Sequence, residues 1–123
     1  MLTSYPIHPT LPVVDMNRAR KFYEEVLGLK LIDAQEWGVR YECGKDTKLL
    51  LYPREATKAD HTTAGFEVDD LEAVVKTLRD KSVVFEEYDT PNLKTVDGIA
   101  SIGTVKVAWF KDTEGNIIAI TQR

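Results

Sequence analysis

The fold of this chain is decided by residues 7–31, IHPTLPVVDMNRARKFYEEVLGLKL, because the pattern that they carry occurs a second time. In the first copy a strand-like segment, Ile7–Val13, leads into a run with helical spacing of its apolar residues. In the second copy Thr62–Val68 leads into another such run, 55 positions later. A repeat of this length indicates two similar supersecondary units packed together.

Both helical runs carry recognisable end signals. Asp15 is a good N-cap for the first helix, and Gly28 stands where a left-handed residue would end it. At the second helix we expect Asp69 and Glu72 to form a variant of the capping box. The expected buried stripe of this helix consists of Leu71, Val74, Val75 and Leu78.

Each helix is followed by three strand-like segments. After the first helix these are Leu29–Asp33, Gly38–Cys43 and Lys48–Pro53, and after the second they are Val83–Tyr88, Val105–Lys111 and Asn116–Thr121. Residues 89–100 are expected to be irregular, either as a lid over a site or as a plain surface excursion. The order of elements is therefore β-α-β-β-β, twice.

This order predicts an α+β fold in which two βαβββ modules, about 5–53 and about 62–123, form a single domain of residues 1–123. One helix for four strands covers one face of each sheet and leaves the other face free. We expect the two modules to pair around a shared cavity between these free faces, and to bind a ligand there.

Composition excludes several classes of protein. The net charge is −4, with acidic and basic residues interspersed, which argues against nucleic acid or an anionic membrane as a partner. No apolar run approaches the roughly 20 residues that span a bilayer. The single cysteine, Cys43, excludes an internal disulfide and suits a reducing compartment, so we expect a cytoplasmic protein.

Three ordered motifs, spread over nearly the whole chain, resemble the vicinal oxygen chelate superfamily. They are Val14–Ala19 with its continuation to Leu29, Phe66–Leu71, and Trp109–Asn116. The superfamily includes glyoxalase I, extradiol dioxygenases, fosfomycin-resistance enzymes and bleomycin-resistance proteins. The resemblance implies the two-module fold, and it implies a homodimer, since many members pair through their sheets. It does not identify one activity, because this fold hosts many.

In metal-dependent members four side chains converge on the ion, one from the first and one from the last strand of each module. Carried onto this chain, the resemblance places these positions at His8, Leu51, Thr63 and Ala119. A shift of one residue would bring in Leu50 or Tyr52, and Ile118 or Ile120, and still no carboxylate. Only His8 is a competent donor, so we predict no metal and no cofactor. The alternative is an unusual site that recruits His8, Glu67 and an acidic loop residue.

Without a metal, the candidate ligand-binding residues are His8, Thr10, Trp37, Arg40, Leu51, Thr63, Trp109 and Ala119. His8 is either a hydrogen-bonded residue of the cavity wall or a polar contact for the ligand, and no catalytic residue is assigned. Aromatic residues in strands are more often core than ligand platform. Trp109 and Phe110 are adjacent in one strand, so one should face the cavity and the other the helix.

The face of the sheet toward which Arg40 points depends on the length of the turn that follows its strand. If residues 44–47 form an even turn, Cys43 pairs with Lys48 and Arg40 pairs with Leu51, which directs Arg40 into the cavity toward a ligand carboxylate or phosphate. An odd turn instead puts Tyr41 in the cavity and Arg40 against the helix. The plain alternative is a solvated arginine at the sheet edge.

The leading interpretation is a metal-free small-molecule-binding protein of the glyoxalase/bleomycin-resistance type, in the manner of the members that sequester drugs. Its ligand would be a small organic molecule in the inter-module cavity. The first alternative is a glyoxalase-like lyase or isomerase, or a dioxygenase, with a non-standard metal set. The second is a regulatory or partner domain without a ligand.

Overall fold

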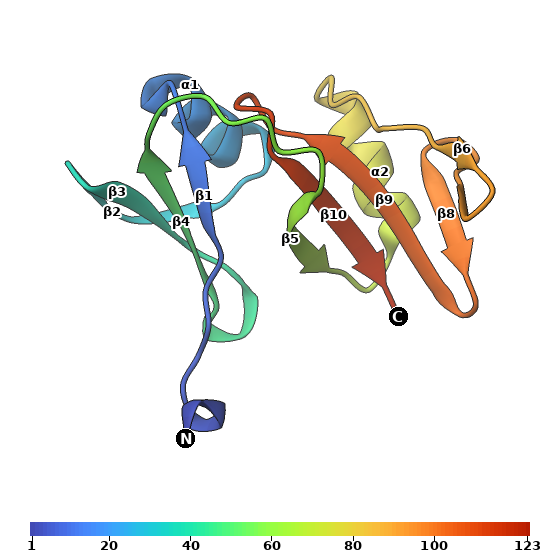
Figure 1. The fold of residues 1–123 in the computed structure, drawn as a ribbon, viewed down its shortest axis with the longest axis horizontal. Coiled ribbons are helices and arrows are strands. Elements are labelled where there is room, and N and C mark those ends of the chain that lie inside the picture. The colour runs from blue at the N-terminus through green and yellow to red at the C-terminus, as the bar shows by residue number, and fades with distance from the viewer. The chain divides into compact units, whose positions relative to one another are not determined.

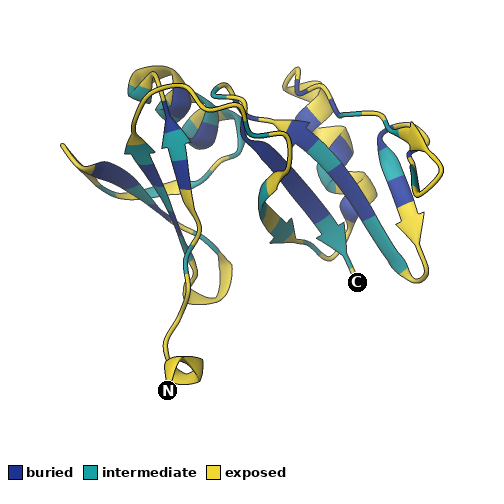
Figure 2. Cartoon of the chain, in the orientation of Figure 1, coloured by how far each residue is buried: buried dark blue, intermediate teal, exposed yellow.

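A computed structural model describes residues 1–123 and divides them into two compact units, Met1–Lys58 and Ala59–Arg123. Each unit contains one four-stranded sheet with a helix packed on one face (Figure 1). Buried residues lie mainly on the strands and on the sheet-facing sides of the helices (Figure 2). No helix is long and apolar enough to cross a membrane. The α+β architecture predicted from the sequence is confirmed.

The sheet of the first unit, here called sheet A, has the strand order β1-β4-β3-β2. Strand β1 is parallel to β4, and the other neighbours are antiparallel. The elements of this unit are β1 (Thr10–Val13), α1 (Met16–Lys21), β2 (Lys30–Gln35), β3 (Gly38–Glu42) and β4 (Lys48–Pro53), with short turns η1 (Leu2–Ser4), η2 (Phe22–Val26) and η3 (Gly44–Asp46).

The expected ends of the first helix are confirmed, but its last turn differs from expectation. The Asp15 carboxylate accepts a hydrogen bond from the Arg18 backbone N–H at 3.1 Å, and Gly28 has a φ of +70°. After Lys21 the helix widens into the π-helical turn η2, in which the Leu27 N–H donates to the Phe22 carbonyl. Nothing in the sequence pattern indicates this turn.

The odd-numbered residues of β3 and β4 face the helix. Tyr41 lies opposite Leu49, its ring stacks on that of Tyr23 at 6.1 Å, and its hydroxyl donates to the Glu24 carboxylate at 2.8 Å. Because Tyr23 and Glu24 belong to η2, the face that carries Tyr41 is the covered one. Leu51, two residues from Leu49, lies on this same face. The even-numbered residues therefore form the helix-free face of sheet A.

The sheet of the second unit, sheet B, has the strand order β5-β10-β9-β8, with β5 parallel to β10. A separate two-stranded hairpin is formed by β6 and β7. The elements are β5 (Thr62–Glu67), α2 (Leu71–Asp80), β6 (Asp89–Thr90), β7 (Leu93–Lys94), β8 (Ile99–Ile102), β9 (Val105–Lys111) and β10 (Ile117–Gln122).

Helix α2 starts one residue later than its predicted capping box requires. The N-cap is Asp70, whose carboxylate accepts from the Ala73 N–H at 3.2 Å, rather than Asp69. Glu72 does not close a box but forms an ion pair with Lys106 of β9 at 2.9 Å. Since Lys106 reaches α2, the even-numbered residues of β9 face the helix.

The predicted strand Val83–Tyr88 is not formed, and the edge of sheet B is instead β8, which begins at Ile99, near the end of the segment that we expected to be irregular. Only an isolated bridge joins Phe85 to Phe110. The cause lies at Glu87, whose carboxylate accepts from the Gly98 N–H at 2.6 Å and from the Thr95 hydroxyl at 2.7 Å. These bonds hold the β6–β7 hairpin in place. The chain therefore pairs with β9 only at Phe85 before the hairpin, and pairs with it again after the hairpin through the four residues of β8.

Candidate functional site

The helix-free face of sheet B carries a row of three residues on neighbouring strands. Trp109 of β9 lies directly opposite Ala119 of β10, and Ala119 lies beside Gly65 of β5. Directly paired residues share a sheet face, so the predicted site residues Trp109 and Ala119 are brought together. Gly65 was not predicted as a site residue. A glycine inside a strand was the available signal for it.

The indole of Trp109 is held from one side by the segment that follows Phe85. The Tyr88 ring meets it edge-to-face, with centroids 5.4 Å apart and an interplanar angle of 89°. The Glu86 N–H donates to the Trp109 carbonyl at 2.8 Å, and the Glu86 carboxylate pairs with Lys111 at 3.5 Å. Trp109 is half-buried, so part of the indole remains available to a ligand.

Phe110 lies on the opposite face of β9, as the alternation of side chains in a strand predicts. It is fully buried and packs edge-to-face on Phe85, with centroids 5.8 Å apart. Trp109 is therefore the aromatic residue of this pair that faces away from α2.

Thr63 occupies an irregular position in β5. The pairing of β5 with β10 passes from Thr62 to Ala64, which leaves Thr63 in a bulge. Its hydroxyl donates to the Ile117 carbonyl at 3.1 Å. This bond uses the hydroxyl proton to satisfy the backbone at the bulge.

On the helix-free face of sheet A, Arg40 forms a two-pronged ion pair with Asp33. The Arg40 Nε and Nη2 atoms donate to the two carboxylate oxygens at 3.0 and 2.7 Å. The hydrogen bonds from Arg40 lower the pKa of Asp33, and the Asp33 carboxylate raises the pKa of Arg40. Arg40 would thus meet a ligand as part of a neutral ion pair, and its Nε and Nη2 donors are already used by Asp33.

The pairing of Arg40 with Leu51, which an even turn would give, does not occur. Glu42 pairs with Lys48, so residues 43–47 form an odd-numbered connection, and Arg40 lies opposite Leu50. Leu51 lies opposite Val39 and is completely buried in the helix-covered core. Leu50 and not Leu51 is the β4 residue that lies directly opposite Arg40.

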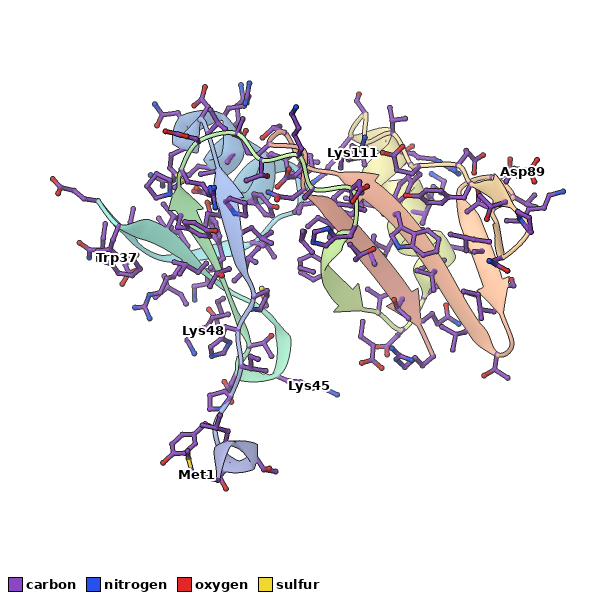
Figure 3. All side chains as sticks on the ribbon, in the orientation of Figure 1. Met1, Trp37, Lys45, Lys48, Asp89 and Lys111 are labelled. Atoms are coloured by element: carbon purple, nitrogen blue, oxygen red, sulfur yellow. The ribbon has the colours of Figure 1, made fainter.

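The remaining predicted residues are only partly brought together. Thr10 is exposed on β1 and lies beside Leu50, which separates it from Arg40 of β3. His8 precedes β1, and its Nδ1 accepts a hydrogen bond from the Lys48 backbone N–H at 2.9 Å. Trp37 stands apart at the tip of the β2–β3 hairpin with 55% of its surface exposed (Figure 3).

The donors do not fit a catalytic metal ion. His8 directs one ring nitrogen at a backbone N–H, and Thr63 directs its hydroxyl at a carbonyl. The β10 position is Ala119, and the β4 residues on the helix-free face are Lys48, Leu50 and Tyr52. No group of three or more His, Cys, Asp or Glu side chains is placed to hold an ion. Divalent ions at catalytic sites take at least three such protein ligands.

Comparison with known proteins gives a family and a set of structures with the same fold. The model of the Glyoxalase/Bleomycin resistance protein/Dioxygenase superfamily matches residues 6–120. No curated protein matches the chain.

Three solved structures illustrate the similarity. TnmS3, an antibiotic binding protein from Streptomyces sp. CB03234, is 24% identical with a TM-score of 0.72, over 99% of this chain and 98% of that one. Lactoylglutathione lyase from Agrobacterium tumefaciens is 20% identical with a TM-score of 0.71, over 97% and 93%. A glyoxalase/bleomycin resistance protein from Streptomyces sp. CB03234 is 25% identical with a TM-score of 0.66, over 92% and 96%.

Proposed function

The chain belongs to the Glyoxalase/Bleomycin resistance protein/Dioxygenase superfamily, and from this membership we propose that it is a metal-free member that binds a small organic molecule. The observation that carries the proposal is the chemistry at the positions where the resemblance puts metal ligands. One is a histidine, one a threonine, and the others are apolar or a tyrosine.

Two features support binding on the helix-free sheet faces. On sheet B, Trp109 presents a half-buried indole beside the small residue Ala119. On sheet A, the Arg40–Asp33 pair supplies polar atoms beside the apolar side chain of Leu50. Apolar and aromatic surface with a few fixed polar groups is the usual composition of a small-molecule site.

The residues proposed to contact ligand are therefore Trp109, Ala119, Thr63, Thr10, Arg40, His8 and Trp37, with Leu50 taking the place of the buried Leu51. TnmS3, which has the same fold, is described as an antibiotic binding protein. Sequestration of a drug is accordingly the biological role that we propose to test first. We also propose that the chain forms a homodimer, which light scattering during gel filtration would measure.

The metal-free state is tested by elemental analysis of the purified protein and by thermal shift with Zn²⁺, Mn²⁺, Ni²⁺ and Fe²⁺. We expect no stoichiometric metal and no stabilisation that depends on His8. Metal that co-purifies in stoichiometric amount and is lost in His8→Ala would overturn the proposal in favour of a lyase, isomerase or dioxygenase.

Ligand binding is tested by tryptophan fluorescence, because the chain has only two tryptophans. Trp37→Phe leaves Trp109 as the sole reporter on sheet B, and Trp109→Phe leaves Trp37 as a separate reporter at the tip of the β2–β3 hairpin. A screen of small organic molecules, antibiotics included, should yield compounds that quench the first variant and whose binding Trp109→Ala weakens. Expression in drug-sensitive bacteria should then raise resistance to those same antibiotics. A screen whose binders are all insensitive to Trp109→Ala, Leu50→Ala and Arg40→Ala would refute the proposed faces.

A further inference from the structure

Gly65 is a strand glycine that the fold does not require. It lies inside β5, is exposed, and does not have the positive φ that favours glycine. A Cβ built on it would meet only the Ala119 Cβ and carbonyl oxygen, both at 3.6 Å, which is ordinary contact. At Gly38, by contrast, a Cβ would lie 2.6 Å from the Leu51 carbonyl oxygen. Glycine weakens a strand, and inside one it often marks a bulge, a tight bend, or close approach of a ligand or another backbone. The bulge of β5 is at Thr63, and no backbone atom lies closer than 3.6 Å to the Cβ built on Gly65, so close approach of a ligand is the reason that remains.

The missing side chain at Gly65 leaves a bare strip beside Trp109. Between Gly65 and the indole lies only the methyl group of Ala119, which is itself buried. Neighbouring strands are about 4.8 Å apart, so the strip from β5 to β9 is roughly 10 Å wide. That width matches two or three fused rings lying flat. Tyr88 fixes the far side of the indole through its edge-to-face contact.

The charge at the end of this strip is negative. Glu67 is two residues beyond Gly65 on β5, on the same face, and it pairs across the sheet with Thr121. Its side chain is exposed and has no lysine or arginine partner. At the opposite end, Glu86 is neutralised by Lys111. The unpaired carboxylate stands about 7 Å from the bare backbone of Gly65, given the rise per residue of a strand.

We propose that the strip formed by Gly65, Ala119 and Trp109 is a stacking site for a planar aromatic cation whose positive group is directed toward Glu67. The ring system rests on the backbone of Gly65 and against the indole, where aromatic and cation–π attraction act together. This inference rests on the proposed ligand-binding function and narrows the ligand to one chemical class.

The test uses the full chain carrying Trp37→Phe and three probes: proflavine, a planar cation; anthracene-9-carboxylate, a planar anion; and amantadine, a cation that is not planar. Binding is followed by isothermal titration and by quenching of Trp109. We expect proflavine to bind at least about tenfold more tightly than either other probe, since each of them loses one of the two attractions.

The decisive variant is Gly65→Val, which fills the strip with a side chain that strands accept well. Proflavine affinity should fall about tenfold or more, while the melting temperature stays the same or rises. Gly65→Ala, whose added methyl meets only ordinary contacts, should give a smaller loss and serves if the valine variant does not fold. Glu67→Gln should weaken proflavine about threefold and abolish the salt dependence of its binding. The matched control is Ser101→Val at the exposed edge strand β8, on the other face, which should change nothing.

The inference is overturned if proflavine does not bind, if the planar anion binds equally well, or if Gly65→Val leaves the affinity unchanged. These results leave the broader proposal standing as long as other molecules quench Trp109 in the ligand screen. Stoichiometric, His8-dependent metal would instead remove the broader proposal while the titrations with proflavine still report on the strip.

Discussion

Replacement of Tyr41 by Phe is the sharpest test of how the helix of the first unit is fixed to its sheet. The Tyr41 ring is fully buried, and its hydroxyl donates to the Glu24 Oε2 atom at 2.8 Å. The same oxygen accepts from the Arg20 Nε at 2.8 Å. Glu24 belongs to the π-helical turn η2, so this carboxylate joins the helix to β3.

The expected loss of stability follows from the kind of bond removed. Hydrogen bonds to charged groups contribute about 1.5–3 kcal/mol. The Glu24 side chain is 30% exposed and keeps its bond to Arg20, so water and the guanidinium offset part of the loss. Because Phe fills the same ring volume, no cavity is added. We therefore expect Tyr41→Phe to lower the free energy of unfolding by about 1–2 kcal/mol, which lowers the melting temperature by about 5 °C.

The deficit should depend on pH in a defined direction. The bond from Arg20, and secondarily that from Tyr41, lower the pKa of Glu24 in the folded protein, against the opposing effect of burial. A carboxyl with a lowered folded pKa contributes stability that is present above its unfolded pKa and lost as the pH falls through its folded pKa. Burial, and then the bond to Glu24, raise the pKa of Tyr41, so its hydroxyl remains a donor throughout this range. The difference between wild type and variant should thus be full at pH 7 and shrink below about pH 4.5, the ordinary value for a glutamate.

The assay is urea denaturation at pH 7 and at pH 3, followed by circular dichroism. Tyr52→Phe is the matched control, because Tyr52 lies on the helix-free face of sheet A and its hydroxyl forms no hydrogen bond within the chain. A double-mutant cycle with Glu24→Gln isolates the pair. Equal stability of Tyr41→Phe and wild type at pH 7 would refute the reasoning, and so would a deficit that persists unchanged at pH 3.

Two further substitutions test other parts of the fold. Gly38→Ala would put a Cβ 2.6 Å from the Leu51 carbonyl oxygen, so urea denaturation should show a loss of about 2 kcal/mol, and a neutral result would contradict the close approach of β3 to β4. Asp112→Ala removes the carboxylate that accepts from the backbone N–H groups of Glu114 and Asn116 at 2.8 Å each. We expect a loss of about 3 kcal/mol by the same assay, whereas Thr113→Ala in the same turn should change stability by less than about 0.5 kcal/mol.

The elements that the sequence predicted well are those with local causes. The N-cap at Asp15 and the left-handed end at Gly28 depend on residues within one helical turn, and both occur as expected. The second cap was misplaced by one residue because Asp69 and Asp70 are chemically equivalent as caps. With Asp70 as the N-cap, Glu72 forms an ion pair with Lys106 instead of a capping box. This contact joins residues that are far apart in the sequence, so the local pattern does not show it.

The edge of sheet B was predicted less well because a single side chain decides it. Residues 83–88 have the composition of a strand, and local propensity favours one. The Glu87 carboxylate instead accepts hydrogen bonds from Thr95 and Gly98 beyond the β6–β7 hairpin, and β8 takes the edge position. A hydrogen bond across eleven residues leaves no periodic signal in the sequence.

Arg40 lies on the helix-free face of sheet A, although the pairing from which we expected this face does not occur. Of the two turn lengths that the sequence left open, the structure has the odd one, and Leu51, which was expected to face the ligand, lies in the helix-covered core. Because side chains alternate with a period of two, a shift of one in the turn and a shift of one in the facing residue together restore the face of Arg40. The ion pair with Asp33 was not foreseen, because the bulge in β2 between Leu31 and Asp33 sets that register.

Gly38 and Gly65 together show where a site residue can be recognised without a bound ligand. Both are glycines in strands, where each weakens the sheet. The structure supplies a reason for Gly38, since the neighbouring backbone lies where its side chain would be, and it supplies none for Gly65. A stability cost that packing does not explain points to function, and at Gly65 the unfilled space lies one strand from Ala119 and two from the indole of Trp109. If filling that space stabilises the chain and removes binding at the same time, the glycine is there for the ligand and not for the fold.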